Sequence, residues 1–193
     1  GNLTNLTSLG LSWNQLNGEI PSELWNLTNL NILWLYGNKL HGEIHPEIGN
    51  LTNLTSLGLG NNYLGCYEYD DNFDYWTDYN CLIHCGNTDQ CNSSIPQEIG
   101  NLTNLTTLNL EQTFISGEIP LEICNIGDSF PSLSNNQLCP PYPDCGEGPI
   151  TSEDEQDTSE CVECSVVLSD LNNDLSLNVM DVILMVGCVL SES

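Results

Sequence analysis

The chain has 193 residues, and its 27 acidic residues against one basic residue, Lys39, give a formal net charge of −26. Such an acidic surface repels phosphate groups, which excludes nucleic acids and anionic membranes as partners. The expected partners are proteins or neutral glycans. A hydrophobic content of 39% is enough for a packed core, so we expect a folded domain rather than a disordered acidic tail.

A 24-residue repeat fills most of the N-terminal part of the chain. Its copies occupy residues 3–26, 27–50, 51–65 (where the third copy is interrupted) and 102–125. Leucines alternate with a period of two near the start of each copy, which predicts a short strand with one buried face. Because a single copy cannot bury its own leucines, we expect the copies to stack around one shared core.

The pattern shared by the copies, LxxLxLxxNxLxGxIPxxL, resembles the leucine-rich repeat, in the subtype common in plant receptor ectodomains. The resemblance covers roughly residues 1–138. It implies an α/β repeat fold, a right-handed solenoid with a parallel β-sheet on its concave face. A disulfide-stapled insertion and a short C-terminal loop-helix motif complete the expected architecture.

One asparagine recurs at the same position in the first three copies, as Asn14, Asn38 and Asn62. A buried side-chain amide at this position can bond the backbone of its own coil and of its neighbour, and so satisfy polar groups inside the core. The fourth copy has Thr113 there, which offers fewer donors. We expect the resulting asparagine ladder to be weakest at Thr113.

Ten cysteines, an even number, fit disulfide pairing in an oxidising compartment. They predict an extracellular protein, either secreted or attached to the cell surface. Four of them, inside the insertion, allow three connectivities, and three more flank the last coil and are expected to staple its end. Cys161 and Cys164 are expected to pair with each other, or with Cys124 or Cys188. The ten are Cys66, Cys81, Cys85, Cys91, Cys124, Cys139, Cys145, Cys161, Cys164 and Cys188.

Eight Asn-x-Ser/Thr sequons would accept N-glycans if the protein passes through a eukaryotic secretory pathway. Seven of them lie inside the repeat, so the repeat pattern itself explains them equally well. The sequon asparagines are Asn2, Asn5, Asn26, Asn50, Asn53, Asn92, Asn101 and Asn104.

The residues between the strand leucines form the expected concave face. They are small or polar in the first and third copies, whereas the second copy carries large apolar side chains. Aromatic rings flanked by glycine and serine are not covered by neighbours, so they suit a sugar ring or a side chain of a partner protein. Packing against a second copy of the molecule would use them equally well. The candidate binding residues are Ile32, Trp34, Tyr36 and Trp13.

The insertion, residues 66–92, begins with a stretch rich in aromatic and acidic residues. Aromatic faces stack on sugar rings, and carboxylates bind sugar hydroxyls or a cation, which favours a recognition loop for a glycan or a protein. Alternatively, the aromatic residues form the core of a disulfide-stapled mini-domain. The candidate binding residues are Tyr67, Tyr69, Asp70, Asp71, Asp74, Tyr75 and Trp76.

Residues 170–181, DLNNDLSLNVMD, place oxygen-bearing residues at positions 1, 3, 5, 7, 9 and 12 of a calcium loop. This spacing resembles one half of a dockerin module, the calcium-binding docking unit of secreted bacterial proteins. It has Leu175 where the sharp turn favours glycine, an aspartate at position 12, and no second loop. The alternative is a degenerate loop that only begins a helix. The calcium ligands would be Asp170, Asn172, Asp174, Ser176 through its carbonyl, Asn178 and Asp181, and calcium is the one cofactor expected.

Three segments are therefore expected along the chain. Residues 1–138 form the solenoid, residues 139–165 form a Cys- and Pro-rich closure with an acidic linker, and residues 166–193 form the dockerin-like loop and an apolar helix. The longest apolar run, residues 182–190, is too short to cross a bilayer, so no membrane insertion is expected.

The sequence has no phosphate loop, no GxSxG and no HExxH motif, so we expect no enzyme. One hypothesis is an extracellular recognition, adhesion or assembly protein that binds a protein or a glycan. The alternative is a structural subunit of a head-to-tail extracellular filament. In that filament, the apolar helix at residues 179–190 of one molecule would cover the open N-terminal coil, residues 3–11, of the next.

Overall fold

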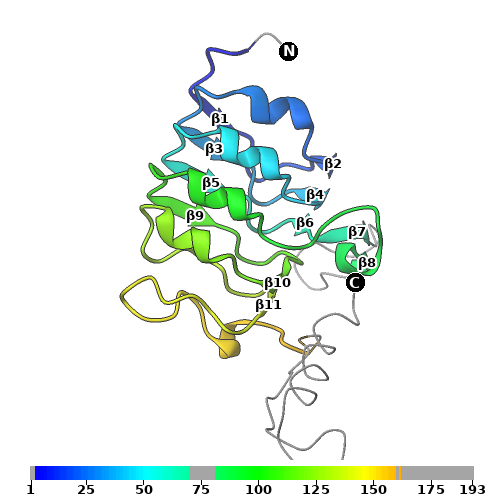
Figure 1. The fold of residues 1–193 in the computed structure, drawn as a ribbon. Coiled ribbons are helices and arrows are strands. Elements are labelled where there is room, and N and C mark those ends of the chain that lie inside the picture. The colour runs from blue at the N-terminus through cyan, green and yellow to red at the C-terminus, as the bar shows by residue number, and fades with distance from the viewer. Residues whose placement is uncertain (1–2, 70–80, 160, 162–193) are drawn as a thin grey trace, which may run out of the picture. The chain divides into compact units, whose positions relative to one another are not determined.

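The computed structural model of the chain describes residues 3–69, 81–159 and 161. All of them belong to one compact unit, residues 1–161. Within it, successive coils of the chain stack on one another, as Figure 1 shows. The predicted stacking of the repeat copies is confirmed.

Four parallel strands, one from each repeat copy, form the main sheet in the order β1-β3-β5-β9 (Figure 1). Their registers align the middle leucines, so that Leu9, Leu33, Leu57 and Leu108 form one continuous row. The last three of these leucines are fully buried, as the period-two pattern predicted. The strands are β1 (Ser8–Gly10), β3 (Ile32–Trp34), β5 (Ser56–Gly58) and β9 (Thr107–Asn109).

Shorter strands continue each coil beyond the main sheet. They form a three-stranded parallel sheet in the order β2-β4-β6 and a two-stranded parallel sheet, β10-β11. The strands are β2 (Asn17–Glu19), β4 (Lys39–Gly42), β6 (Tyr63–Leu64), β10 (Ser116–Glu118) and β11 (Gln137–Cys139).

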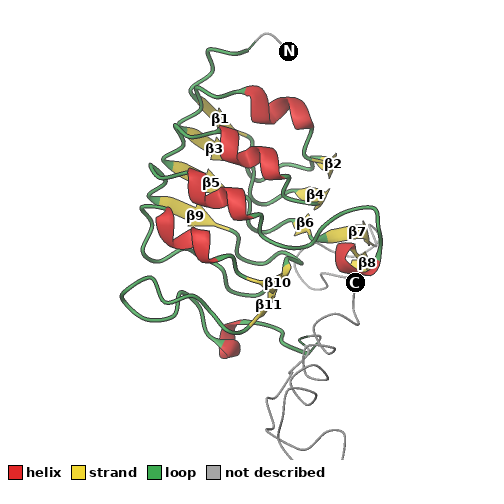
Figure 2. Ribbon diagram, in the orientation of Figure 1, coloured by secondary structure: helices red, strands yellow, loops and turns green. Residues whose placement is uncertain are grey.

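Each coil returns through a short 3₁₀ helix, and these helices stack on the side of the coils away from the main sheet (Figure 2). Each helix starts at or just after a proline. Pro46 is the first residue of its helix, where its fixed φ suits the helical turn and its missing N–H would be unpaired anyway, whereas Pro21, Pro96 and Pro120 precede their helices in extended conformation. The IP pair therefore marks the start of three of these helices, whereas in the second coil His45 separates Ile44 from Pro46. The helices are η1 (Ser22–Asn26), η2 (Pro46–Asn50), η4 (Gln97–Asn101) and η5 (Leu121–Asn125), with two shorter ones at η3 (Cys85–Asn87) and η6 (Glu153–Glu155).

The buried asparagine ladder links the coils through the core. The Asn62 amide nitrogen donates to the carbonyl of Leu35 in the preceding coil (3.0 Å) and to that of Leu59 in its own coil (2.9 Å). Its Oδ1 accepts a hydrogen bond from the backbone N–H of Leu40 (3.0 Å). Asn38 and Asn136 repeat this arrangement toward the first and fourth coils.

The fourth coil interrupts this ladder. The Thr113 hydroxyl donates to Oδ1 of Asn136, beyond the fourth coil (2.5 Å), with the Leu110 carbonyl of its own coil farther away (3.4 Å), and in the described part of the chain no side-chain bond from Thr113 reaches back to the third coil. The expected weak point of the ladder is therefore confirmed. A threonine has no second donor with which to reach the neighbouring backbone.

Four disulfides hold the insertion and the C-terminal end of the stack. Those of the insertion are Cys66–Cys81 and Cys85–Cys91. The closure contains Cys124–Cys145 and Cys139–Cys161. The prediction for Cys161 was wrong, because its partner is Cys139. The segment around Thr151 and Gln156 folds back on the last coil, where the Gln156 amide donates to the Leu133 carbonyl (3.0 Å), and this brings Cys161 toward Cys139.

The two ends of the stack differ. At the C-terminal end, Leu133 and Leu138 are buried beneath the closure. In the first coil, Leu3 is 67% exposed and Leu11 and Leu16 are 39% and 38% exposed. Of the two ends of the stack, the first coil is therefore the one whose leucines are left partly exposed among the described residues.

Candidate functional site

The exposed side of the β1-β3-β5-β9 sheet, here called the sheet face, carries the candidate binding residues of the second coil. Trp34 ends β3, and its neighbours in register on β1 and β5 are Gly10 and Gly58. Its side chain is 42% exposed, and its Nε1–H donates to the Ser56 hydroxyl (2.9 Å). The hydrogen bond fixes the indole while leaving much of the ring in solvent.

Two further aromatic residues adjoin Trp34. The rings of Trp13 and Tyr36 meet edge to face, with centroids 5.8 Å apart and an interplanar angle of 86°. The sequence placed Tyr36 among glycine and serine neighbours, yet Trp13, which is 54% exposed, packs against it from the turn after β1. We call Trp13, Trp34 and Tyr36 the aromatic patch.

Glycines make room for these rings. A Cβ atom on Gly37 would lie 2.5 Å from Cε3 of Trp13, and one on Gly58 would lie 3.0 Å from Cδ1 of Tyr36. The rings therefore lie close to the backbone of neighbouring coils and lose little freedom when a partner binds. Small residues beside the rings, not only the rings themselves, build the aromatic patch.

The two halves of the sheet face differ in chemistry. Ile32 is half-buried on β3, between Ser8 and Ser56 in register, and adds apolar area beside the aromatic patch. The fourth coil presents polar groups instead, from Thr107 and Asn109. A ligand on this face would meet an aromatic half and a hydrogen-bonding half.

The described part of the insertion includes an antiparallel hairpin of β7 (Cys66–Tyr69) and β8 (Cys81–His84), closed by the Cys66–Cys81 disulfide. Tyr69 stacks on Tyr63 of the solenoid with centroids 4.2 Å apart, and Tyr63 in turn stacks on Phe114 at 6.0 Å. Tyr69 therefore packs on the solenoid, whereas Tyr67 is 39% exposed. The other candidate residues of the insertion, Asp70, Asp71, Asp74, Tyr75 and Trp76, lie outside the described residues.

His41 packs against this hairpin. Its ring centroid lies 5.4 Å from that of Tyr69, and within the described ranges its buried Nδ1 has no hydrogen-bond partner. Burial lowers the pKa of His41 below its usual value, while the Glu19 carboxylate opposes that shift. The neutral ring is therefore the form that the folded protein favours.

We predict that His41 makes the stability of the protein pH-dependent. Because the pKa of His41 is lower in the folded than in the unfolded chain, its stabilising contribution is present above about pH 6.5 and is lost as the pH falls below it. The measurement is the difference in unfolding free energy between the wild type and His41→Gln, taken from about pH 8 to about pH 5. A difference that stays constant over this range contradicts the prediction.

The sequon asparagines of the repeat have structural roles in at least two coils. The amide nitrogen of Asn53 donates to the carbonyl of Thr28 (2.8 Å), and that of Asn104 donates to the carbonyl of Thr52 (2.9 Å). Asn29 makes the same bond to Thr4 without belonging to a sequon. These bonds explain the asparagines by coil stacking, and glycosylation of the sequons stays a prediction.

The calcium loop, Cys164, Cys188 and the apolar helix lie outside the described residues. Calcium binding and the filament contact therefore stay predictions. In residues 3–69 and 81–159, no three histidine, cysteine or carboxylate side chains gather as a metal site would require. Within the same ranges, no helix has the length and apolarity needed to cross a membrane.

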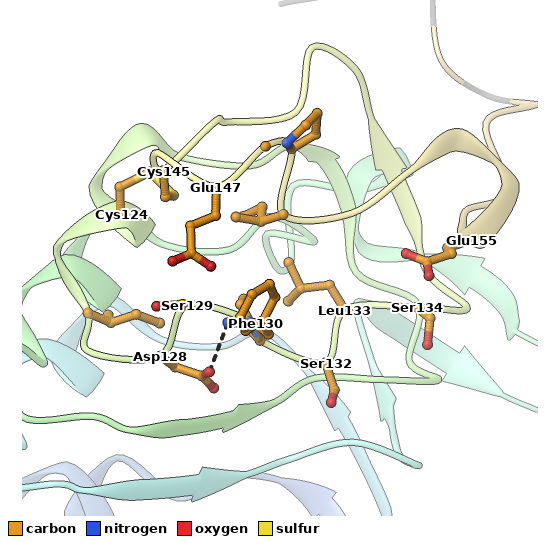
Figure 3. Close-up of a pocket in the computed structure, with 15 residues that line it drawn as sticks. Cys124, Asp128, Ser129, Phe130, Ser132, Leu133, Ser134, Cys145, Glu147 and Glu155 are labelled. Carbon is orange, nitrogen blue, oxygen red and sulfur yellow. Dashed lines mark hydrogen bonds between the residues drawn. A yellow bond between two sulfur atoms is a disulfide. The ribbon is translucent and has the colours of Figure 1, made fainter.

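One feature of the closure is absent from the sequence predictions. A cavity of about 380 Å³ lies between the last coil and the loop held by Cys124–Cys145, as Figure 3 shows. Phe130, which is 76% exposed, and Glu147 line it. The signal in the sequence that could have pointed to this cavity is Phe130, a large apolar residue in the segment where the repeat pattern degrades.

Comparison with known proteins identifies the repeats. The Leucine Rich Repeat family model matches residues 5–27, 29–51 and 104–126. Comparison with curated proteins gives no match. Together with the parallel strands and the four disulfides, the three matches to the Leucine Rich Repeat model show that the fold is of the leucine-rich-repeat type. Domains of this fold are typically binding domains rather than enzymes.

Similar solved structures include plant receptors. The BIR2 ectodomain from Arabidopsis thaliana is 27% identical over 77% of this chain and 64% of its own, with a TM-score of 0.57. The plant peptide hormone receptor RGFR1, in complex with RGF2, is 34% identical over 69% of this chain and 17% of its own, with a TM-score of 0.53. The Arabidopsis receptor kinase HAESA is solved in complex with the peptide hormone IDA and the co-receptor SERK1. It is 32% identical over 72% of this chain and 19% of its own, with a TM-score of 0.54.

This chain thus spans less than two thirds of the length of each of these three structures. Among the similar structures, ectodomains recur. Together with the four disulfides, they indicate an extracellular protein.

Proposed function

We propose that this chain is an extracellular recognition module that binds a segment of a partner protein on its sheet face, with the aromatic patch as the main anchor. The observation that carries the proposal is the placement of Trp13, Trp34 and Tyr36 as partly exposed rings held by glycine contacts and by the Trp34–Ser56 hydrogen bond. Interfaces concentrate their binding energy in such aromatic anchors.

The partner class follows from the chemistry of the face. The sheet face offers the apolar area of Ile32 and Trp34 beside the polar groups of Thr107 and Asn109. RGFR1 and HAESA, whose structures are similar to this one, are solved in complex with RGF2 and with the peptide hormone IDA. A protein segment with one or two apolar side chains fits this combination, and a neutral glycan is the alternative that the experiment separates.

The proposal is tested by selecting displayed peptides on the immobilised protein and measuring their affinity for the wild type and Trp34→Ala. We expect selected peptides to lose at least about 2 kcal/mol of binding free energy, roughly thirtyfold in Kd, when Trp34 is truncated. Trp13→Ala should cause a similar loss, because its ring supports Tyr36.

Leu121→Ala serves as the control, since Leu121 is a large exposed apolar residue in η5, away from the sheet face. Its affinity for the selected peptides should equal that of the wild type. Peptides that bind all three variants alike would refute the aromatic patch as the anchor. Glycan-array binding that depends on Trp34, without any selected peptide, would refute a protein partner.

A further inference from the structure

The cavity beside the closure is bounded by two structural units that are far apart in the sequence. The segment that follows η5 contributes Phe130, and the disulfide-held loop contributes Glu147. In Figure 3, the Glu147 carboxylate and the Phe130 ring point into the same opening. The buried side chains of Ile126 and Leu133 also line it.

The backbone on both sides of Phe130 is fixed. One carboxylate oxygen of Asp128 accepts a hydrogen bond from the N–H of Phe130 (3.0 Å), and the other accepts one from the N–H of Leu108 in β9 (2.7 Å). The following residue, Pro131, is buried. The backbone that carries the exposed ring of Phe130 is therefore held in place.

Glu147 is presented by a similarly constrained loop. The Oδ1 atom of Asp144 accepts hydrogen bonds from the N–H groups of Gly146 (2.8 Å) and Gly148 (3.1 Å), one on each side of Glu147. The neighbouring Cys145 is tied to η5 through Cys124. The backbone is thus restrained both at the exposed carboxylate of Glu147 and at the exposed ring of Phe130.

We propose that this cavity takes the arginine side chain of a partner protein. A guanidinium group can stack on an aromatic face while its donors bind a carboxylate, which a lysine ammonium does less well. The chain supplies no such cation nearby, because its one basic residue, Lys39, lies in β4. A volume of about 380 Å³ is at the small end of ligand pockets, which suits one side chain.

Charge complementarity points to the same occupant. At a formal net charge of −26, the protein attracts basic segments from a distance and repels acidic ones. The cavity then selects among basic residues by its aromatic wall. This site does not rest on the aromatic patch of the sheet face, and it would remain if the proposed function of that patch failed.

The test uses the full ¹⁵N-labelled chain and three capped tripeptides, Gly-Arg-Gly, Gly-Lys-Gly and Gly-citrulline-Gly, followed by NMR. We expect the arginine peptide to shift the amide signals of Phe130 and Glu147, with weaker binding of the lysine peptide and none of the uncharged citrulline peptide. Phe130→Ala and Glu147→Gln should each raise the dissociation constant about threefold or more. Glu23→Gln, an equal change of charge in η1, should leave it unchanged.

Three outcomes overturn the proposal. Shifts spread evenly over the acidic surface would show attraction without a site. Equal binding of the lysine peptide would show that a point charge suffices and that the aromatic wall selects nothing. Unchanged affinity in Phe130→Ala would show that the cavity does not hold the side chain, and the folded state of that variant is checked by its own spectrum.

Discussion

Replacing Asn62 with alanine is expected to lower the free energy of unfolding by about 2–4 kcal/mol. Asn62 is fully buried, and its amide bonds the carbonyls of Leu35 and Leu59 and the N–H of Leu40. Alanine would leave these groups buried without their partner, and each such group costs about 1–3 kcal/mol when no water replaces the bond. The loss should be large because the bonds join two coils.

The matched control is Asn14→Ala, at the same repeat position in the first coil. Asn14 is exposed and, among the residues that the structure describes, bonds only Leu11 and Ser12 of its own coil, so we expect a change within about 0.5 kcal/mol. Urea unfolding followed by circular dichroism measures both variants. Equal losses in the two variants would show that the ladder between coils does not stabilise the fold.

Replacing Gly65 with alanine is expected to cost about 2–5 kcal/mol of unfolding free energy. Gly65 has φ +87°, which disfavours any side chain, and an added Cβ would lie 2.1 Å from the carbonyl oxygen of Phe114. This backbone belongs to the next coil and cannot move away as a flexible side chain could. The position is also where the chain leaves β6 for the hairpin of the insertion.

Gly18→Ala separates the cost of the backbone conformation from the cost of the steric clash with Phe114. Gly18 has nearly the same conformation, φ +89°, but no atom lies within 4 Å of an added Cβ. Its expected cost is therefore the conformational part alone, about 1–2 kcal/mol. The two variants are compared by the same urea titration. A Gly65→Ala variant as stable as Gly18→Ala would contradict the close approach of Gly65 to Phe114.

The sequence predicted the repeated part of the fold because each feature recurs at a fixed spacing. The leucine alternation located the main strands, and the positions of Asn38, Asn62 and Thr113 anticipated both the ladder and its weak point. The pairing of Cys161 with Cys139 was not predictable in this way, since it depends on how residues 150–157 fold back on the last coil.

The candidate site was predictable in part, for the same reason. Alternation along the second strand placed Trp34 and Tyr36 on one face. The contact between Trp13 and Tyr36 depends on a turn that aims the side chain toward the next coil, where Gly37 makes room for it. The approach of Phe130 to Glu147 depends on the Cys124–Cys145 pairing, which the sequence left open.

The most direct test of the sheet face as the binding surface is the NMR spectrum of the four tryptophan indole N–H groups during titration with a selected peptide. We predict that the signals of Trp13 and Trp34 shift, while that of Trp25, which is 1% exposed in the core, stays in place. A shift confined to Trp76 of the insertion would contradict the account, because it would place the ligand on that loop instead.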